Sequence, residues 1–187
     1  MFNLFRSSKT RAMSRATIER LYGAIVAQSR RADFYTDFGV PDTLEGRFEM
    51  VVLHTVLACH RLKGGDTLER SLSQDIFDAF AADMDATMRE LGVGDLTVPK
   101  KMKKVGEAFF GRAAAYDAAL AHADDAALVQ ALSRNILSTG EAPPSPEAVA
   151  LAAYVRAAVA KLRATPTEIL ARGVLDLPDP ARRESET

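Results

Sequence analysis

The sequence predicts an all-α fold, a single compact domain of about six to seven helices in which most neighbours run antiparallel. Apolar residues recur at spacings of three and four along several long segments, and no segment shows the two-residue alternation of a strand. Clusters of glycine and proline separate these segments, as expected for turns between helices. A chain of 187 residues is also long enough to bury a core without metals or disulfides.

The composition excludes several classes of protein. The net charge is −1, so the overall charge favours no nucleic-acid partner, and we expect no sequence-specific contact with nucleic acid. Cys59 is the only cysteine, which excludes an internal disulfide and fits a reducing compartment. No apolar run approaches the roughly 20 residues that span a bilayer. We therefore expect a soluble, cytoplasmic protein whose contact with any membrane is peripheral.

The first 13 residues are predicted to form a flexible basic arm. Residues 1–31 contain seven arginines and lysines but one acidic residue, and the arm opens with the apolar stretch 1–5. A frayed terminus is the favoured interpretation. The alternatives are contact with an anionic membrane surface, with the apolar tip inserted, and an organelle transit peptide.

The first helix is predicted from a cap at Ser14 to about Arg31. The connection that follows, 32–42, is unusually aromatic because it contains Phe34, Tyr35 and Phe38. We expect this loop to pack onto the core, with the lining of a groove as the alternative.

The second helix begins at Asp42 or Thr43 and ends at the glycine pair 64–65. It is apolar on most sides, which predicts a central position in the fold. A polar seam remains in which Arg47, His54 and Arg61 are spaced by seven, with Met50 between the first two. A lone helical histidine in such a seam is more typical of a hydrogen-bonding residue than of a haem ligand, but haem ligation by His54 stays open.

The third helix, about 68–91, and the fourth helix are joined by a short turn, so they should be antiparallel neighbours. Gly92 and Gly94 break the chain, Asp95 or Thr97 can cap the fourth helix, and Pro99 fits its first turn. Four lysines follow in this helix. They are Lys100, Lys101, Lys103 and Lys104.

Phe109 falls on the apolar stripe of the fourth helix, whereas Phe110 falls off it, near Gly106. A bulky ring beside a glycine and close to lysines is typical of a surface that receives another helix. The alternative is a buried Phe110 in a thick core with solvated lysines. Those lysines can also be partly neutralised by the acidic face of the third helix, formed by Asp75, Asp78 and Asp85.

The rest of the chain completes a helical domain over 14–172. A short helix at about 126–137 is followed by a proline-rich linker at 140–146, and Ser145 and Pro146 begin a further helix. Another short turn of helix begins at 165–166. The segment 173–187 is predicted to be a disordered tail.

Motifs for catalysis are lacking in the sequence. No phosphate loop, dinucleotide fingerprint or nucleophile elbow occurs. His54 and His60 are six residues apart, which places them on nearly opposite sides of a helix and does not suit a metal. Cys59 lies on the buried stripe, as expected for a packing residue. We therefore expect no enzyme, no metal and no cofactor.

Three segments together resemble the ubiquinol–cytochrome c chaperone family. The first is FGVPDTLEGRFEM at 38–50, and the second is LH at 53–54. The third combines GVGD at 92–95, PKKMKK at 99–104 and FFGRAAAY at 109–116. The resemblance covers about 18–137, and the alanine-rich composition favours a bacterial member.

The resemblance implies a non-enzymatic assembly chaperone. Members of the family bind newly made cytochrome b and hold it until haem and partner subunits are in place, which promotes assembly of the cytochrome bc1 complex. Mitochondrial members also work with a small partner protein near the ribosomal tunnel exit. For this chain the implied partners are cytochrome b and the ribosome surface, at the inner-membrane face of the cytoplasm.

We expect a client groove of adaptable apolar side chains with a basic rim. The hypothesis places Arg47, His54, Lys100, Lys103, Lys104 and Arg112 along one rim. The full set of candidate client-binding residues is Phe34, Tyr35, Asp42, Arg47, Met50, His54, Asp95, Lys100, Lys103, Lys104, Phe109, Phe110 and Arg112. The rival interpretations are a general helical adaptor and a haem-handling protein that uses His54.

Overall fold

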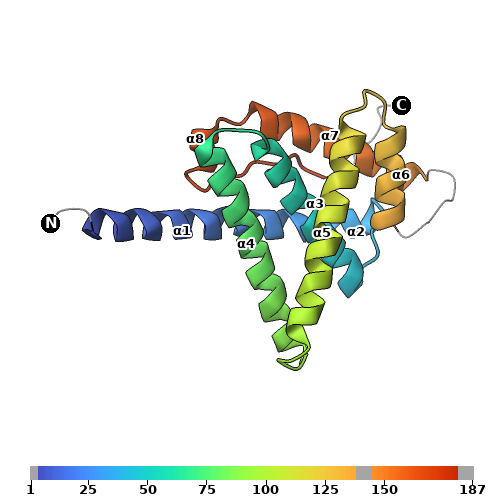
Figure 1. Cartoon of the computed structure of the whole chain (residues 1–187). Helices are drawn as coiled ribbons and strands as arrows, with labels where there is room; N and C mark the ends of the chain where they lie inside the picture. Colours follow the sequence, from blue (N-terminus) through green and yellow to red (C-terminus); the bar gives the residue numbers. More distant parts are fainter. Residues whose placement is uncertain (1–3, 138–144, 181–187) are drawn as a thin grey trace.

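The computed structural model describes residues 4–137 and 145–180, with side chains described from residue 15 onward. The regular elements of these residues are all helices, which confirms the predicted all-α fold (Figure 1). The helices are α1 (Leu4–Ser29), α2 (Asp33–Thr36), α3 (Leu44–Leu62), α4 (Thr67–Glu90), α5 (Val98–Leu120), α6 (Ala126–Asn135), α7 (Pro146–Ala164) and α8 (Thr167–Leu170). No helix within the described ranges has the length and apolar character to cross a bilayer.

Helix α3 is the centre of the fold, as its apolar pattern predicts. The hydroxyl of Thr43 accepts a hydrogen bond from the backbone N–H of Gly46 and so caps the first turn. The helix packs against α1, α4, α5 and α7, and most of its side chains are buried, including Leu53 and Leu57. A helix surrounded on this many sides fixes the positions of the elements that it contacts.

Helices α4 and α5 form an antiparallel hairpin in front of α3 (Figure 1). A capping box between Asp66 and Glu69 starts α4, and Gly92 ends it with a φ of 78° that favours glycine. Pro99 opens α5, but Thr97 makes no side-chain capping bond, and Asp95 instead forms an ion pair with Arg89. The two helices meet at the connection 91–97 and diverge toward the body, so the hairpin has the shape of a V.

Helix α7 packs on another side of α3, and α6 packs against α5 and α7. The hydroxyl of Ser145 accepts from the backbone N–H of Ala148, which caps α7 as predicted. Helix α7 packs on both α3 and α6 and buries Leu151, Val155 and Leu162. Residues 140–144 of the predicted linker lie outside the described residues, whereas Ser145 and Pro146 form the cap and the first position of α7.

The ends of the domain differ from the predicted limits. Helix α1 begins at Leu4, before the cap predicted at Ser14, and its first turns project from the body (Figure 1). Residues 173–180 lie against the body, where Lys161 bonds Asp176, Gln28 donates to the carbonyl of Pro178 and Arg31 pairs with Asp179. The helical domain thus extends past 172 to at least 180. Residues 1–3 and 181–187 lie outside the described residues.

Candidate functional site

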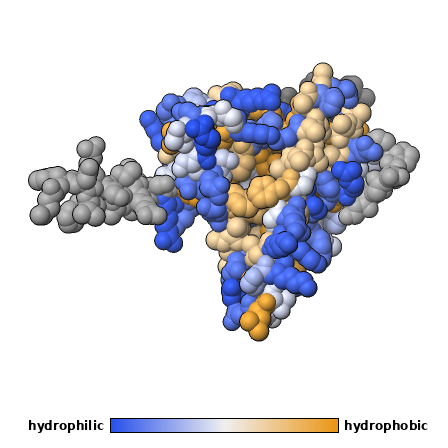
Figure 2. Space-filling view, in the orientation of Figure 1, coloured by the Kyte–Doolittle hydropathy of each residue, from blue (hydrophilic) through white to orange (hydrophobic). Residues whose placement is uncertain are grey.

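An open cleft of 610 Å³ lies where α4 and α5 diverge, with the second half of α3 as its floor. Its apolar lining comes from all three helices and includes Val56, Leu62, Phe77, Phe109, Phe110 and Ala113. Polar side chains stand around the mouth, among them His60, Lys63, Arg70, Gln74 and Asp117. The space-filling view shows apolar atoms at the centre of this face with hydrophilic ones around them (Figure 2).

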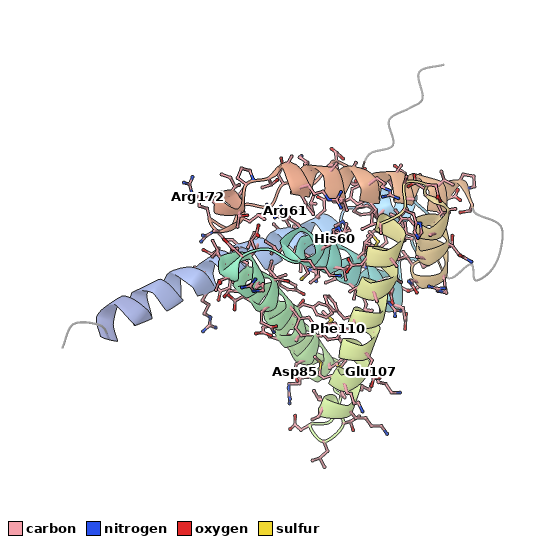
Figure 3. The ribbon with its side chains drawn as sticks, turned by 45° about the horizontal axis from the view of Figure 1, so that its top comes forward. His60, Arg61, Asp85, Glu107, Phe110 and Arg172 are labelled. Carbon is pink, nitrogen blue, oxygen red and sulfur yellow. The ribbon has the colours of Figure 1, made fainter. Side chains whose placement is uncertain are left out.

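Three phenylalanines form one wall of the cleft. The ring of Phe77 on α4 lies 5.0 Å from that of Phe109 and 5.2 Å from that of Phe110, measured between centroids. Phe109 and Phe110 meet edge to face at 5.6 Å. Phe109 is 3% exposed, whereas Phe110 is 61% exposed and lies between the arms of the hairpin (Figure 3). A large ring left this exposed at the edge of an apolar cleft marks a surface suited to binding.

The mouth of the cleft is ordered by a charged cluster around Asp117 of α5. Its carboxylate accepts a hydrogen bond of 2.6 Å from Nδ1 of His60 and another from Nζ of Lys63. Nε2 of His60 lies 3.4 Å from Nη2 of Arg163, an arrangement that suits a ring in which Nδ1 donates to Asp117. Burial by itself raises the pKa of Asp117, but the bonds from Lys63 and His60 outweigh it and hold that pKa below its usual value.

Cys59 also lines the cleft, but its thiol is poorly suited to reaction. Burial raises its pKa to about 11, and Sγ lies 3.7 Å from the carbonyl oxygen of Ser73. The thiol therefore stays protonated near neutral pH and acts as a packing group, as its place on the apolar stripe predicts.

Three of the predicted site residues lie in the interior and do not line the cleft. Phe34 and Met50 are fully buried, and His54 is 1% exposed. Nδ1 of His54 donates to the carbonyl of Met50 at 2.8 Å, and Nε2 accepts from the hydroxyl of Tyr154 at 2.8 Å. Burial lowers the pKa of His54 to about 4.

His54 is thus a structural residue that joins α3 to α7. Both ring nitrogens have internal partners, so neither faces a space that a haem iron can reach without rearrangement of the core. The placement of His54 on a groove rim is corrected by its burial. Its seven-residue spacing from Arg47 and Arg61 suggested a shared polar seam, but α7 covers the middle of that seam.

A small cluster at the start of α3 consists of the exposed Asp42 and Arg47 and the half-buried Tyr35. Nε of Arg47 donates to the carboxylate of Asp42 at 2.6 Å, and its guanidinium lies 6.0 Å from the ring centroid of Tyr35. The hydroxyl of Tyr35 donates to the carbonyl of Ser29 at 2.8 Å. None of the three lines the cleft.

The remaining basic candidates are also away from the cleft. Arg112 forms an ion pair with Glu49 of α3, which fastens α5 to the central helix. Lys100, Lys103 and Lys104 are exposed on the first turns of α5, close to Asp95 and the closed end of the V. The structure thus does not bring the six predicted rim residues onto one surface.

Of the thirteen candidates, Phe109 and Phe110 lie together in the cleft. Sequence reasoning missed the polar mouth of His60, Lys63, Arg70, Gln74 and Asp117. One signal was available in the sequence. The small residues Ala113 and Ala114 follow Phe110, and their short side chains leave space above this part of α5. However, the cleft also needs residues of α3 and α4, which are distant from Phe110 in the sequence. No spacing within a single helix shows that these residues meet in the fold.

The fold and the cleft together define an all-α protein with an open apolar cleft. Residues 36–177 match the sequence model of the family described as "Ubiquinol-cytochrome C chaperone", and the chain belongs to this family. This result confirms the resemblance drawn from the segments between 38 and 116. The matched region begins later and ends further along the chain than the predicted 18–137.

Two relatives support this assignment. The chain is 26% identical over 119 residues to "Ubiquinol-cytochrome-c reductase complex assembly factor 1" of Xenopus laevis. That alignment covers 64% of this chain and 59% of the frog protein. The structure also matches the "Crystal structure of the Cbp3 homolog from Brucella abortus" with a TM-score of 0.84 and 44% sequence identity, over 95% of this chain and 96% of the other.

Proposed function

We propose that this protein is a non-enzymatic assembly chaperone for the cytochrome bc1 complex, and that it holds newly made cytochrome b in the cleft between α3, α4 and α5. Family membership and the name of the frog relative support the assembly role. The observation that carries the choice of site is Phe110, whose exposed ring borders an open apolar cleft.

The size of the cleft defines what it holds. A volume of 610 Å³ is in the range of sites that enclose a small ligand, so it accommodates several side chains of one helix face rather than a whole helix. An unassembled membrane subunit presents apolar helix faces of this kind. The proposed mode is therefore a client helix that lies across the V and inserts a few apolar side chains between Phe77 and Phe110.

The polar mouth supports reversible holding. Asp117 accepts hydrogen bonds from Lys63 and His60, so these three polar side chains already have partners before a client arrives. The affinity then comes from the apolar surface, which is the part of the client that becomes buried when the complex assembles.

The test uses photo-crosslinking in the host. A photoreactive amino acid at Ala114, which lines the cleft, is expected to capture cytochrome b during its synthesis. The matched position is Val149 of α7, which is 52% exposed and does not line the cleft. Deletion of the gene is expected to lower the amount of assembled bc1 complex relative to the other respiratory complexes.

Two outcomes contradict the proposal. Capture at Ala114 of soluble proteins without any bc1 subunit favours a general adaptor. A normal level of bc1 complex in the deletion strain excludes the assembly role.

A further inference from the structure

The tip of the α4–α5 hairpin carries leucines that the fold does not bury. The connection 91–97 forms the closed end of the V, and Leu96 and Leu91 within it are 98% and 60% exposed. Figure 2 shows an apolar spot at this tip, separate from the apolar centre of the same face. Exposed leucines on a projecting turn add nothing to the core, and exposed apolar residues of this kind suit contact with another surface.

The first two turns of α5 place positive charge beside these leucines. Lys100, Lys101, Lys103 and Lys104 are all exposed. Residues 89–104 contain five basic side chains and two acidic ones. Arg89 bonds both Asp85 and Asp95, and thereby neutralises acidic groups at the same tip.

The lysines at the start of α5 form few ion pairs within the fold. Lys103 lies 3.8 Å from Glu107, but within the described residues no ion pair joins Lys100, Lys101 or Lys104 to an acidic side chain. The acidic face of α4 therefore forms no ion pair with these lysines among the described residues. The positive end of the α5 dipole adds to the same field.

We propose that the hairpin tip docks on an anionic lipid surface, with Leu91 and Leu96 at the boundary between headgroups and acyl chains and the lysines of α5 at the lipid phosphates. Apolar side chains next to lysines match the layered polarity of a bilayer surface. Nucleic acid offers phosphates for the lysines but no apolar layer for a leucine that is 98% exposed. The pairing of the two features thus favours lipid over RNA.

The length of the α5 arm sets the distance between the docked tip and the cleft. Phe110 is 12 residues along α5 from Val98, where the helix begins, which corresponds to about 18 Å at the rise of an α-helix. A docked tip therefore holds the cleft at a fixed height above the membrane, with the open end of the V directed away from the tip (Figure 1). This inference rests on the tip alone and does not depend on the identity of the client.

The experiment measures binding of the full chain to vesicles of phosphatidylcholine with and without phosphatidylglycerol. Binding is expected only with the anionic lipid. The double variant Leu91→Ser/Leu96→Ser is expected to weaken binding about tenfold or more, since each leucine loses its apolar burial. Reversal of Lys100 and Lys104 to Glu is expected to weaken it at least about 20-fold, since each lysine near an anionic surface contributes about fivefold.

The matched control is Leu68→Ser. Leu68 is 48% exposed on the same hairpin but stands at the far end of α4, so binding should be unchanged. All these side chains are exposed, and unchanged melting temperatures will show that the variants fold. The segment 1–13 is present in every variant, so any lipid affinity of its own cancels in the comparison.

Wild-type binding by the Leu91→Ser/Leu96→Ser variant overturns the proposal. So does equal loss with Leu68→Ser. Binding of a ribosomal RNA fragment that needs the lysines but not the leucines assigns the surface to RNA instead.

Discussion

Arg112 of α5 and Glu49 of α3 form a two-pronged ion pair. Nε and Nη2 of the arginine donate to the two carboxylate oxygens at 2.7 and 2.5 Å, and the side chains are 25% and 11% exposed. The hydrogen bond to Glu49 also raises the pKa of Arg112. The pair fastens one arm of the V to the central helix, so its role is in the geometry of the cleft rather than in its lining.

Loss of Arg112 is expected to destabilise the fold. Arg112→Ala leaves the carboxylate of Glu49 partly buried without its partner, which costs about 2–4 kcal/mol of unfolding free energy. Urea denaturation measures this change. Arg47→Ala is the matched control, because its pair with Asp42 is exposed and should leave the urea midpoint unchanged. If Arg112→Ala keeps the wild-type stability but no longer captures the client, Arg112 contacts the client directly, as the sequence-based hypothesis holds.

His54 is expected to make stability fall in mild acid. Its folded pKa is about 4, below the ordinary 6.5, so the unfolded chain binds a proton first as the pH falls. The contribution of neutral His54 is present above pH 6.5, declines from there to about pH 4, and amounts to at most about 3 kcal/mol. Unfolding free energies at a series of pH values measure the slope.

The control for this slope is a second histidine variant. His54→Gln should flatten the pH dependence of stability between pH 6.5 and 4, whereas His122→Gln should keep it, because His122 is exposed. An unchanged slope in His54→Gln would show that another group dominates this range.

The neighbours Phe109 and Phe110 are expected to separate folding from binding. Phe109 is buried, so Phe109→Ala should lower the unfolding free energy by about 3–5 kcal/mol. Phe110→Ala should leave the melting temperature near the wild-type value but reduce client cross-linking at Ala114 about tenfold. Large destabilisation by Phe110→Ala would mean that this ring belongs to the core, and the cleft would lose its proposed anchor.

Two helical glycines are expected to respond in opposite directions to alanine. A Cβ at Gly106 meets no atom within 4 Å, so Gly106→Ala should stabilise α5 by up to about 1 kcal/mol. A Cβ at Gly46 would lie 2.0 Å from the carbonyl oxygen of Pro41, so Gly46→Ala should lower the melting temperature because the loop before α3 must move. Thermal unfolding measures both, and destabilisation by Gly106→Ala would reveal a contact of α5 that the monomer does not show.

The helices and much of their order were predictable from the chain itself. The periodicity around Leu53 and Leu57 indicated a central helix, and the caps at Thr43 and Ser145 lie where their chemistry predicts. The limits at the ends were less predictable. The segment 173–180 looked disordered because it lacks periodicity, but Gln28 of α1 donates to the carbonyl of Pro178 and Arg31 pairs with Asp179. These two contacts span 150 and 148 positions in the sequence.

The candidate site was predictable only in part. The place of Phe110 off the apolar stripe of α5 indicated a surface ring, and the structure puts that ring beside the cleft. The basic rim was not predictable, because charge and spacing do not show whether a side chain is paired. His54 faces Tyr154, Arg112 faces Glu49, and the lysines stand at the hairpin tip.

The sequence by itself determined the helical class, the central position of α3 and the family, because each depends on patterns within one segment or on motifs in order. Only the tertiary structure decided where the cleft lies and which charges surround it. The physical reason is that the cleft arises from the divergence of α4 and α5 over α3. Helix α5 is held on α3 by long-range pairs such as Glu49 with Arg112 and His60 with Asp117.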